Sequence, residues 1–167
     1  VVNYLLPLQL GHCSNESIIC RDEVCYLRVG RTYTNPIISD KSVPDPSVIR
    51  ANDGYFYLYA TQTKTYWMPV YRSKDLVNWE YQGTAFNKAT EPDLPGGGAF
   101  WAPEIRFLNG KYVLYYSWAK MNGADISYTA VAVGDTPMGP FLDSKELIGN
   151  KEFGSNCIDQ FYYEEDG

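Results

Sequence analysis

Two aspartates, Asp45 and Asp159, are the residues of this chain whose surroundings and spacing could do chemistry. Asp45 stands between two prolines in "SVPDPSVIR", and Asp159 follows an apolar residue in "NCIDQFYY". Each proline fixes its own backbone and favours an extended conformation in the residue before it, so we expect Asp45 to enter the next strand along one path. The simplest alternative is a turn aspartate that bonds nearby backbone. Two carboxylates held across a gap could instead serve hydrolysis, in which one activates water while another group supplies a proton.

These two aspartates occupy the same position of an internal repeat. The stretch "DPSVIRANDGYFYLYAT" lies over "APEIRFLNGKYVLYYS", which in turn lies over "DQFYYEEDG". The first residues of the three stretches, Asp45, Ala102 and Asp159, are separated by 57 positions each time, 102 minus 45 and 159 minus 102. Asn109 and Asp166, which each precede a glycine, are also 57 positions apart. A constant period of this length indicates a repeat architecture.

Each repeat reads as a series of strands. Segments 55–61, 111–118 and 126–133 are rich in aromatic and β-branched residues and are separated by turn residues, and no segment shows a helical period. Tandem units of four strands are typical of propeller blades, whose faces are buried against neighbouring blades. In a propeller, the starts of the inner strands converge on a central channel. The repeat therefore predicts that Asp45 and Asp159 meet there, as the paired carboxylates of glycoside hydrolysis do.

Bulk composition indicates a folded domain and excludes several classes of partner. The chain has 167 residues, 45% of them hydrophobic, which is enough for one domain with a sizeable core. Its formal net charge is -6 and its 14 Lys and Arg residues are scattered, so we expect no nucleic-acid partner. The sequence contains no run of 18 apolar residues, so it predicts no membrane-spanning helix. Aromatic residues make up 16% of the chain, which suits both strands and stacking on sugar rings.

The N-terminal segment is the part that the repeat does not reach. We expect residues 1–31 to be irregular or a remnant of an export signal, since "VVNYLLPLQLG" has the length of a signal-peptide apolar region. An export signal would place the protein outside the cell, in the periplasm or on the cell surface. Three of the four cysteines, Cys13, Cys20 and Cys25, lie here with a single histidine, in no spacing typical of zinc. A disulfide between Cys20 and Cys25 is open, and we predict no metal site.

Five short motifs, in order and at blade spacing, resemble glycoside hydrolase family 43. They are "PDPSVI" (44–49), "YRSKDLVNW" (71–79), "WAPEI" (101–105), "GKYVLYYS" (110–117) and "NCIDQFYY" (156–163). The resemblance covers about residues 33–167 and implies an all-β, five-bladed propeller. On this reading residues 32–167 form its first part, truncated to about two blades and the inner strand of a third. The family hydrolyses α-L-arabinofuranosyl and β-D-xylosyl linkages of plant polysaccharides with inversion, so the implied partner is an arabinose- or xylose-containing oligo- or polysaccharide.

The resemblance also implies roles for individual residues. Asp45 matches the general base that activates water, and Asp159 matches the aspartate that orients the general acid and raises its pKa. Trp101 matches a stacking face beside the sugar, although a tryptophan in the blade core is an equally simple explanation. Three further residues are expected to line the pocket or approach the substrate: Asn156, Ile158 and Gly123.

The chain departs from the family pattern in two ways. The family usually has proline after the second aspartate, whereas this chain has Gln160, which puts the rigidity of Asp159 in question. The glutamate general acid is expected about one repeat after Asp159, outside this chain, and we expect a structural role for Glu104. These 167 residues alone should therefore be inactive. The resemblance implies no cofactor in this chain, although a Ca²⁺ ion is possible in the complete propeller.

Three interpretations remain open at this level. The "N-x-I-D" context of Asp159 resembles endo-arabinanases and slightly favours arabinan over xylan. A fructan-cleaving, retaining five-bladed enzyme would carry "NDPNG" near its start, and this string is absent from the sequence. A non-catalytic carbohydrate-binding propeller, or a decayed fragment, would explain Gln160 and the missing glutamate.

Overall fold

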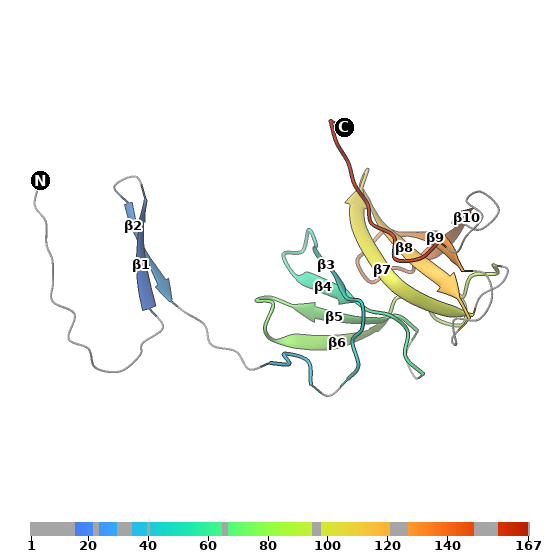
Figure 1. The fold of residues 1–167 in the computed structure, drawn as a ribbon, viewed down its shortest axis with the longest axis horizontal. Coiled ribbons are helices and arrows are strands. Elements are labelled where there is room, and N and C mark those ends of the chain that lie inside the picture. Colours follow the sequence, from blue (N-terminus) through green and yellow to red (C-terminus); the bar gives the residue numbers. More distant parts are fainter. Residues whose placement is uncertain are drawn as a thin grey trace, which may run out of the picture. The chain divides into compact units, whose positions relative to one another are not determined.

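The structure, a computed structural model, divides the chain into two units, Val1–Asn35 and Pro36–Gly167 (Figure 1). It describes residues 16–21, 24–29, 35–39, 41–64, 67–94, 98–120, 127–148 and 157–166, and of 16–21, 24–29 and 145–147 the backbone alone. Three residues that the sequence singled out, Cys13, Gly123 and Asn156, lie outside this described part.

The first unit contains an antiparallel hairpin of β1 (Glu16–Arg21) and β2 (Val24–Val29). An irregular segment or export-signal remnant was expected over residues 1–31, and 16–21 and 24–29 form paired strands there. Both strands contain β-branched residues, β2 also contains a tyrosine, and a connection of two residues is the commonest hairpin length. The register places Cys20 opposite Cys25.

The second unit contains two four-stranded antiparallel sheets, each ordered as a simple meander. The first sheet has the order β3-β4-β5-β6, with β3 Ser47–Arg50, β4 Phe56–Tyr59, β5 Pro69–Ser73 and β6 Trp79–Thr84. The second has the order β10-β9-β8-β7, with β7 Ala99–Leu108, β8 Lys111–Ala119, β9 Tyr128–Gly134 and β10 Leu142–Ile148. This confirms the prediction of two successive four-stranded units, and the described residues contain no helix.

Residues 157–166 begin the third repeat but form no strand, which corrects the expected inner strand. They run beside β7, as the red segment in Figure 1 shows. Their contacts with the second sheet include ring contacts rather than a backbone ladder. Tyr162 stacks on Tyr115 with the ring centroids 6.1 Å apart, and the Arg106 guanidinium lies 5.7 Å from the centre of the Phe161 ring.

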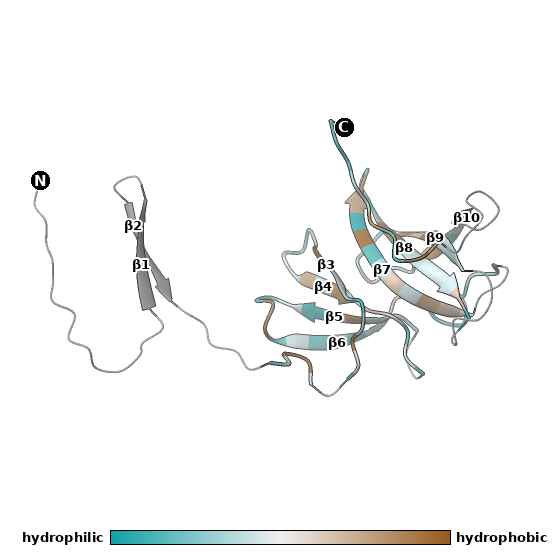
Figure 2. Cartoon of the chain, in the orientation of Figure 1, coloured by the Kyte–Doolittle hydropathy of each residue, from teal (hydrophilic) through white to brown (hydrophobic). Residues whose placement is uncertain are grey.

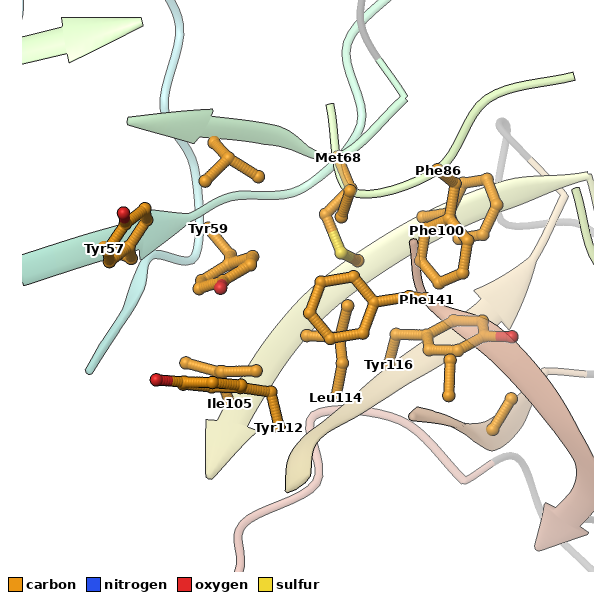
Figure 3. Close-up of a cluster of buried hydrophobic side chains, with 14 of the residues drawn as sticks. Tyr57, Tyr59, Met68, Phe86, Phe100, Ile105, Tyr112, Leu114, Tyr116 and Phe141 are labelled. Atoms are coloured by element: carbon orange, nitrogen blue, oxygen red, sulfur yellow. The ribbon is translucent and has the colours of Figure 1, made fainter. Parts of the chain in front are cut away.

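One aromatic core joins the two sheets, as the propeller prediction requires. Figure 3 shows buried side chains from both sheets gathered around Phe86, Phe100 and Phe141. The rings of Phe86 and Phe100 stack with their centroids 4.3 Å apart, while Tyr59 of the first sheet meets Phe141 edge-on at 6.1 Å. Full burial of one such side chain contributes roughly 1.5–3 kcal/mol to stability. The core therefore holds the two sheets together.

The inner strands β3 and β7 contact each other and are joined by a buried polar group. β7 is mainly hydrophobic in Figure 2 and is interrupted by its two charged residues, Glu104 and Arg106. The Ser47 hydroxyl donates a hydrogen bond of 3.2 Å to Glu104 and accepts one of 3.2 Å from the Ile105 N–H. Arg106 completes the group with an ion pair of 2.5 Å to the other oxygen of Glu104. These contacts give Glu104 a structural role between the sheets.

At the end of the first sheet opposite to the start of β3, a polar turn joins β5 to β6. The Asp75 carboxylate accepts hydrogen bonds from the backbone N–H groups of Asn78 at 2.8 Å and Val77 at 3.0 Å, and from the Ser73 hydroxyl at 3.1 Å. The bonds from Asn78 contribute most to holding the pKa of Asp75 well below its usual range. The motif "SKDLVNW" forms this turn, and the turn sets the register of the outer strand β6 against β5.

Candidate active site

Three residues at the same repeat position adopt the left-handed backbone conformation. Their φ angles are 49° for Asp45, 40° for Ala102 and 57° for Asp159. The extended conformation expected for Asp45 is therefore wrong. A following proline disfavours the right-handed helical region, and the chain here meets that restriction by turning left instead of extending. Left-handed backbone costs roughly 1–2 kcal/mol in an L-residue, so the surrounding contacts must hold all three positions.

A hydroxyl at the end of the second strand of each sheet supplies that contact. The Thr61 hydroxyl, just after β4, accepts a hydrogen bond of 2.7 Å from the Ala102 N–H. The Ser117 hydroxyl, on β8, accepts one of 3.0 Å from the Asp159 N–H. Each hydroxyl thus reaches from its own repeat to the left-handed residue that opens the next one. A hydrogen bond contributes about 0.5–1.5 kcal/mol, which is comparable with the cost of the left-handed backbone.

The Asp45 carboxylate is exposed and is oriented by the same threonine. The Thr61 hydroxyl donates a hydrogen bond of 2.7 Å to Asp45 Oδ2, and the Thr61 N–H donates one of 3.0 Å to the carbonyl oxygen of Pro44. Among the described residues, no hydrogen bond reaches Asp45 Oδ1. The bond orients the carboxylate and leaves its other oxygen for a water molecule, which is what a general base requires.

Asp159 is also exposed, and its position is set through Gln160. The Gln160 side-chain N–H donates a hydrogen bond to the Ala102 carbonyl oxygen, and its oxygen accepts one of 3.2 Å from the Ser117 hydroxyl. A continuous hydrogen-bonded path therefore runs from Asp45 through Thr61, Ala102 and Gln160 to Ser117 and on to the Asp159 backbone. It connects the Asp45 carboxylate to the backbone of Asp159, the two residues that the repeat predicts to meet at the channel.

Of the remaining predicted site residues, the structure describes two, Trp101 and Ile158. Trp101 is half-buried on β7, where its register partner is Ser117, and its neighbour Phe100 fills the core. Because alternate residues of a strand point to opposite faces, Trp101 projects away from that core. Ile158, directly before Asp159, is 45% exposed. Asn156 and Gly123 lie outside the described residues.

A pocket of about 350 Å³ opens at the end of the first sheet that carries Asp45. The register pairs Pro69 with Thr84 at this end, and the pocket is lined by Trp67, Thr84, Phe86, Asn87 and Lys88. A tryptophan face beside amide and ammonium groups suits a sugar ring, which offers both an apolar face and hydroxyls.

A second pocket, of about 320 Å³, lies at the opposite end of the sheet beside the Asp75 turn. Its aromatic ring is already covered, because the Arg72 guanidinium lies 4.4 Å and the Lys74 ammonium 5.0 Å from the centre of the Tyr55 ring. The first pocket, lined by Trp67, is therefore the better candidate for sugar binding.

Sequence reasoning missed Thr61, Ser117 and Trp67, and it took Gln160 as a weakness. A signal for two of them was present, since Thr61 and Ser117 are the last residues of the aligned stretches "DPSVIRANDGYFYLYAT" and "APEIRFLNGKYVLYYS". A hydroxyl at the same place in two repeats is a candidate for the same bond in each. The role of Gln160 had no such signal, because it depends on two residues, 58 and 43 positions away, that only the fold brings near.

Within the described part of the chain, no three His, Cys, Asp or Glu side chains gather as a metal site would require. No helix found among those residues has the length and apolar character needed to cross a membrane.

Comparison with known proteins points to one family of carbohydrate-active enzymes. Residues 33–167 match the family described as "Glycosyl hydrolases family 43". The chain is 31% identical over 118 residues to a non-reducing end α-L-arabinofuranosidase of Bacteroides ovatus, covering 68% of this chain and 22% of that protein. It is 33% identical over 94 residues to a β-xylosidase of Bacillus subtilis, covering 53% of this chain and 17% of that protein.

The fold leads to the same group of proteins. The structure resembles the crystal structure of a thermostable family-43 glycoside hydrolase with a TM-score of 0.64 and 33% sequence identity, over 81% of this chain and 42% of the solved one. The chain spans less than half the length of each of these three proteins.

Proposed function

The chain belongs to family 43 of the glycosyl hydrolases, and on that basis we propose that it forms the first part of an inverting glycosidase with a five-bladed propeller. The substrate would be a plant polysaccharide that contains arabinose or xylose. One observation carries the proposal: Asp45 and Asp159 share a repeat position and a left-handed backbone, and one hydrogen-bonded path connects them. Glycoside hydrolysis needs carboxyl groups held in fixed positions, and these two would be the base and the residue that tunes the acid.

In this proposal Asp45 is the general base. The bond from Thr61 holds Oδ2, so Oδ1 would take a proton from a water molecule as that water attacks the anomeric carbon. Inversion requires room for this water between the base and the acid, whose carboxyl groups are about 6.5–9.5 Å apart in inverting enzymes. The exposure of Asp45 is consistent with access for water.

Asp159 would act on the general acid. A negative charge close to a second carboxyl group favours the protonated form of that group and so raises its pKa, which lets it donate a proton near neutral pH. We propose that this acid is a glutamate about one repeat after Asp159, as the family resemblance implies, and that it is not Glu104, which is engaged by Ser47 and Arg106.

Aromatic side chains would bind the sugar units. Trp101 lies one residue from Ala102 on the path between the carboxylates, and Trp67 lines the pocket at the same end of the first sheet. Stacking of a sugar face on such rings tolerates either arabinose or xylose. We favour arabinan slightly, because the "N-x-I-D" context of Asp159 resembles endo-arabinanases and the relatives include an α-L-arabinofuranosidase.

The test is hydrolysis by the full-length protein that contains this chain. We expect release of sugar from debranched arabinan and from a chromogenic α-L-arabinofuranoside, with slower release from xylan and a β-D-xyloside. Fructan should be left intact, because its hydrolysis would point to the retaining alternative. If the protein binds arabinan in affinity electrophoresis but releases no sugar from any of these substrates, it is a carbohydrate-binding propeller and the proposal is wrong.

A further inference from the structure

The residue after each left-handed position is proline in two repeats and glutamine in the third. Pro46 follows Asp45 and Pro103 follows Ala102, whereas Gln160 follows Asp159 at the same spacing of 57 residues. A proline restricts both its own backbone and that of the residue before it. The third repeat lacks this restriction, yet Asp159 has the same backbone conformation as the other two positions.

Hydrogen bonds of the Gln160 side chain supply what the proline ring supplies elsewhere. The amide N–H group donates to the carbonyl oxygen of Ala102, in the preceding repeat, and the amide oxygen accepts from Ser117, which itself binds the Asp159 N–H. Ser117 is fully buried and so provides a fixed point for this contact. Both bonds lead to the second repeat, so they fix the segment that carries Asp159 relative to the second sheet.

Comparison of the two hydroxyls shows why a glutamine fits here. Thr61 accepts from the Ala102 N–H and donates its own hydrogen to the Asp45 carboxylate. Ser117 accepts from the Asp159 N–H, but the residue in its repeat that corresponds to Asp45 is Ala102, which has no acceptor in its side chain. The Gln160 oxygen takes the place of that missing carboxylate. Each hydroxyl therefore has both a donor and an acceptor as partners.

We propose that Gln160 is a positioning residue for Asp159 and replaces, by hydrogen bonds across the blade boundary, the proline that holds the equivalent residue in the other two repeats. The proposal rests on the proposed function in one respect only, which is that Asp159 acts in catalysis. Gln160 itself need not touch the substrate.

The test compares variants of the full-length protein at position 160. Gln160→Ala removes both bonds and should lower kcat by up to about 10²-fold, the size of loss that a misplacement of about 1 Å can cause. KM should change much less, because Asp159 acts on the proton donor in the transition state rather than on substrate binding. Gln160→Met keeps the length of the side chain without the bonds and should behave alike, which covers the case in which the alanine variant does not fold.

Rescue by proline separates positioning from general stability. Gln160→Pro should recover most of kcat although it also lacks the amide group, because proline is already tolerated after Asp45 and Ala102 in the same backbone conformation. The matched control is Gln82→Ala on β6, the outer strand of the first sheet, where the glutamine also donates to backbone carbonyl oxygens. This control should leave kcat and KM unchanged.

Each of three outcomes would contradict a different part of the proposal. If Gln160→Ala and Gln160→Met keep the kcat of the wild type, Gln160 positions nothing. If Gln160→Pro loses as much kcat as Gln160→Ala, the equivalence with Pro46 and Pro103 is wrong. If Asp159→Asn retains full activity, the proposed role of Asp159 fails first, whatever the variants at position 160 show.

Discussion

Replacement of Asp45 by asparagine in the full-length protein is expected to lower kcat by about 10²–10⁴-fold, the usual contribution of a general base. The amide has the shape of the carboxylate and can still accept the hydrogen bond from Thr61, but it cannot take a proton from water. Asparagine also tolerates the left-handed backbone found at this position. KM and the midpoint of thermal unfolding should therefore stay close to the wild-type values while turnover is lost.

Asp135→Asn is the matched control for this substitution. It makes the same chemical change at an exposed carboxylate, whose partner Lys111 begins β8 at the end opposite Ser117. Exposed ion pairs contribute about 0–1 kcal/mol, so this variant should keep full activity and nearly full stability. Wild-type turnover by Asp45→Asn would exclude Asp45 as the base. A lowered unfolding midpoint in Asp45→Asn but not in Asp135→Asn would assign Asp45 a structural role.

The second large effect is expected from the 167-residue chain by itself, whose hydrolysis of arabinosides and xylosides should not exceed the uncatalysed background. Inverting hydrolysis needs a base and a proton donor on opposite sides of the anomeric carbon. The chain supplies the proposed base, whereas we propose that the donor lies about one repeat after Asp159; Glu104 is held by Ser47 and Arg106. The measurement is release of nitrophenol at equal molar concentrations of the chain and the full-length protein.

Circular dichroism of both samples is the control, since a chain that has lost its strands would be inactive for another reason. Robust hydrolysis by the folded 167-residue chain would mean that the proton donor lies within it. That result would contradict the assignment of the acid to a later repeat and would direct attention back to Glu104.

Much of the fold was predictable because its signals can be read directly from the sequence. Strand composition and Asx-Gly turns appear in neighbouring residues, and the constant period of 57 residues appears when the sequence is aligned with itself. Together they predicted two four-stranded units in the second part of the chain. The start of β7 was not predictable in this way. It begins at Ala99, three residues before the aligned position Ala102, since the ladder with β8 continues across a bulge between Trp101 and Glu104.

The candidate site was predictable only in outline, for a physical reason. Asp45 and Asp159 could be selected because a repeat places equivalent residues together. The left-handed backbone of Asp45 was missed, because a proline in the sequence excludes one region of backbone space without selecting among the others. Gln160 was read as a loss of rigidity, although its two side-chain bonds supply that rigidity from another repeat. Contacts over such sequence distances depend on the fold and leave no local pattern.

The most direct test of the account is the anomeric configuration of the sugar that the full-length protein releases, recorded by proton NMR in the first minutes of reaction with an α-L-arabinofuranoside or a β-D-xyloside. If Asp45 activates water against the anomeric carbon while a separate acid protonates the leaving group, the first product must have the configuration opposite to that of the substrate. A first product of retained configuration would mean that a carboxylate attacks the sugar itself, and it would contradict the assignment of Asp45 as a general base.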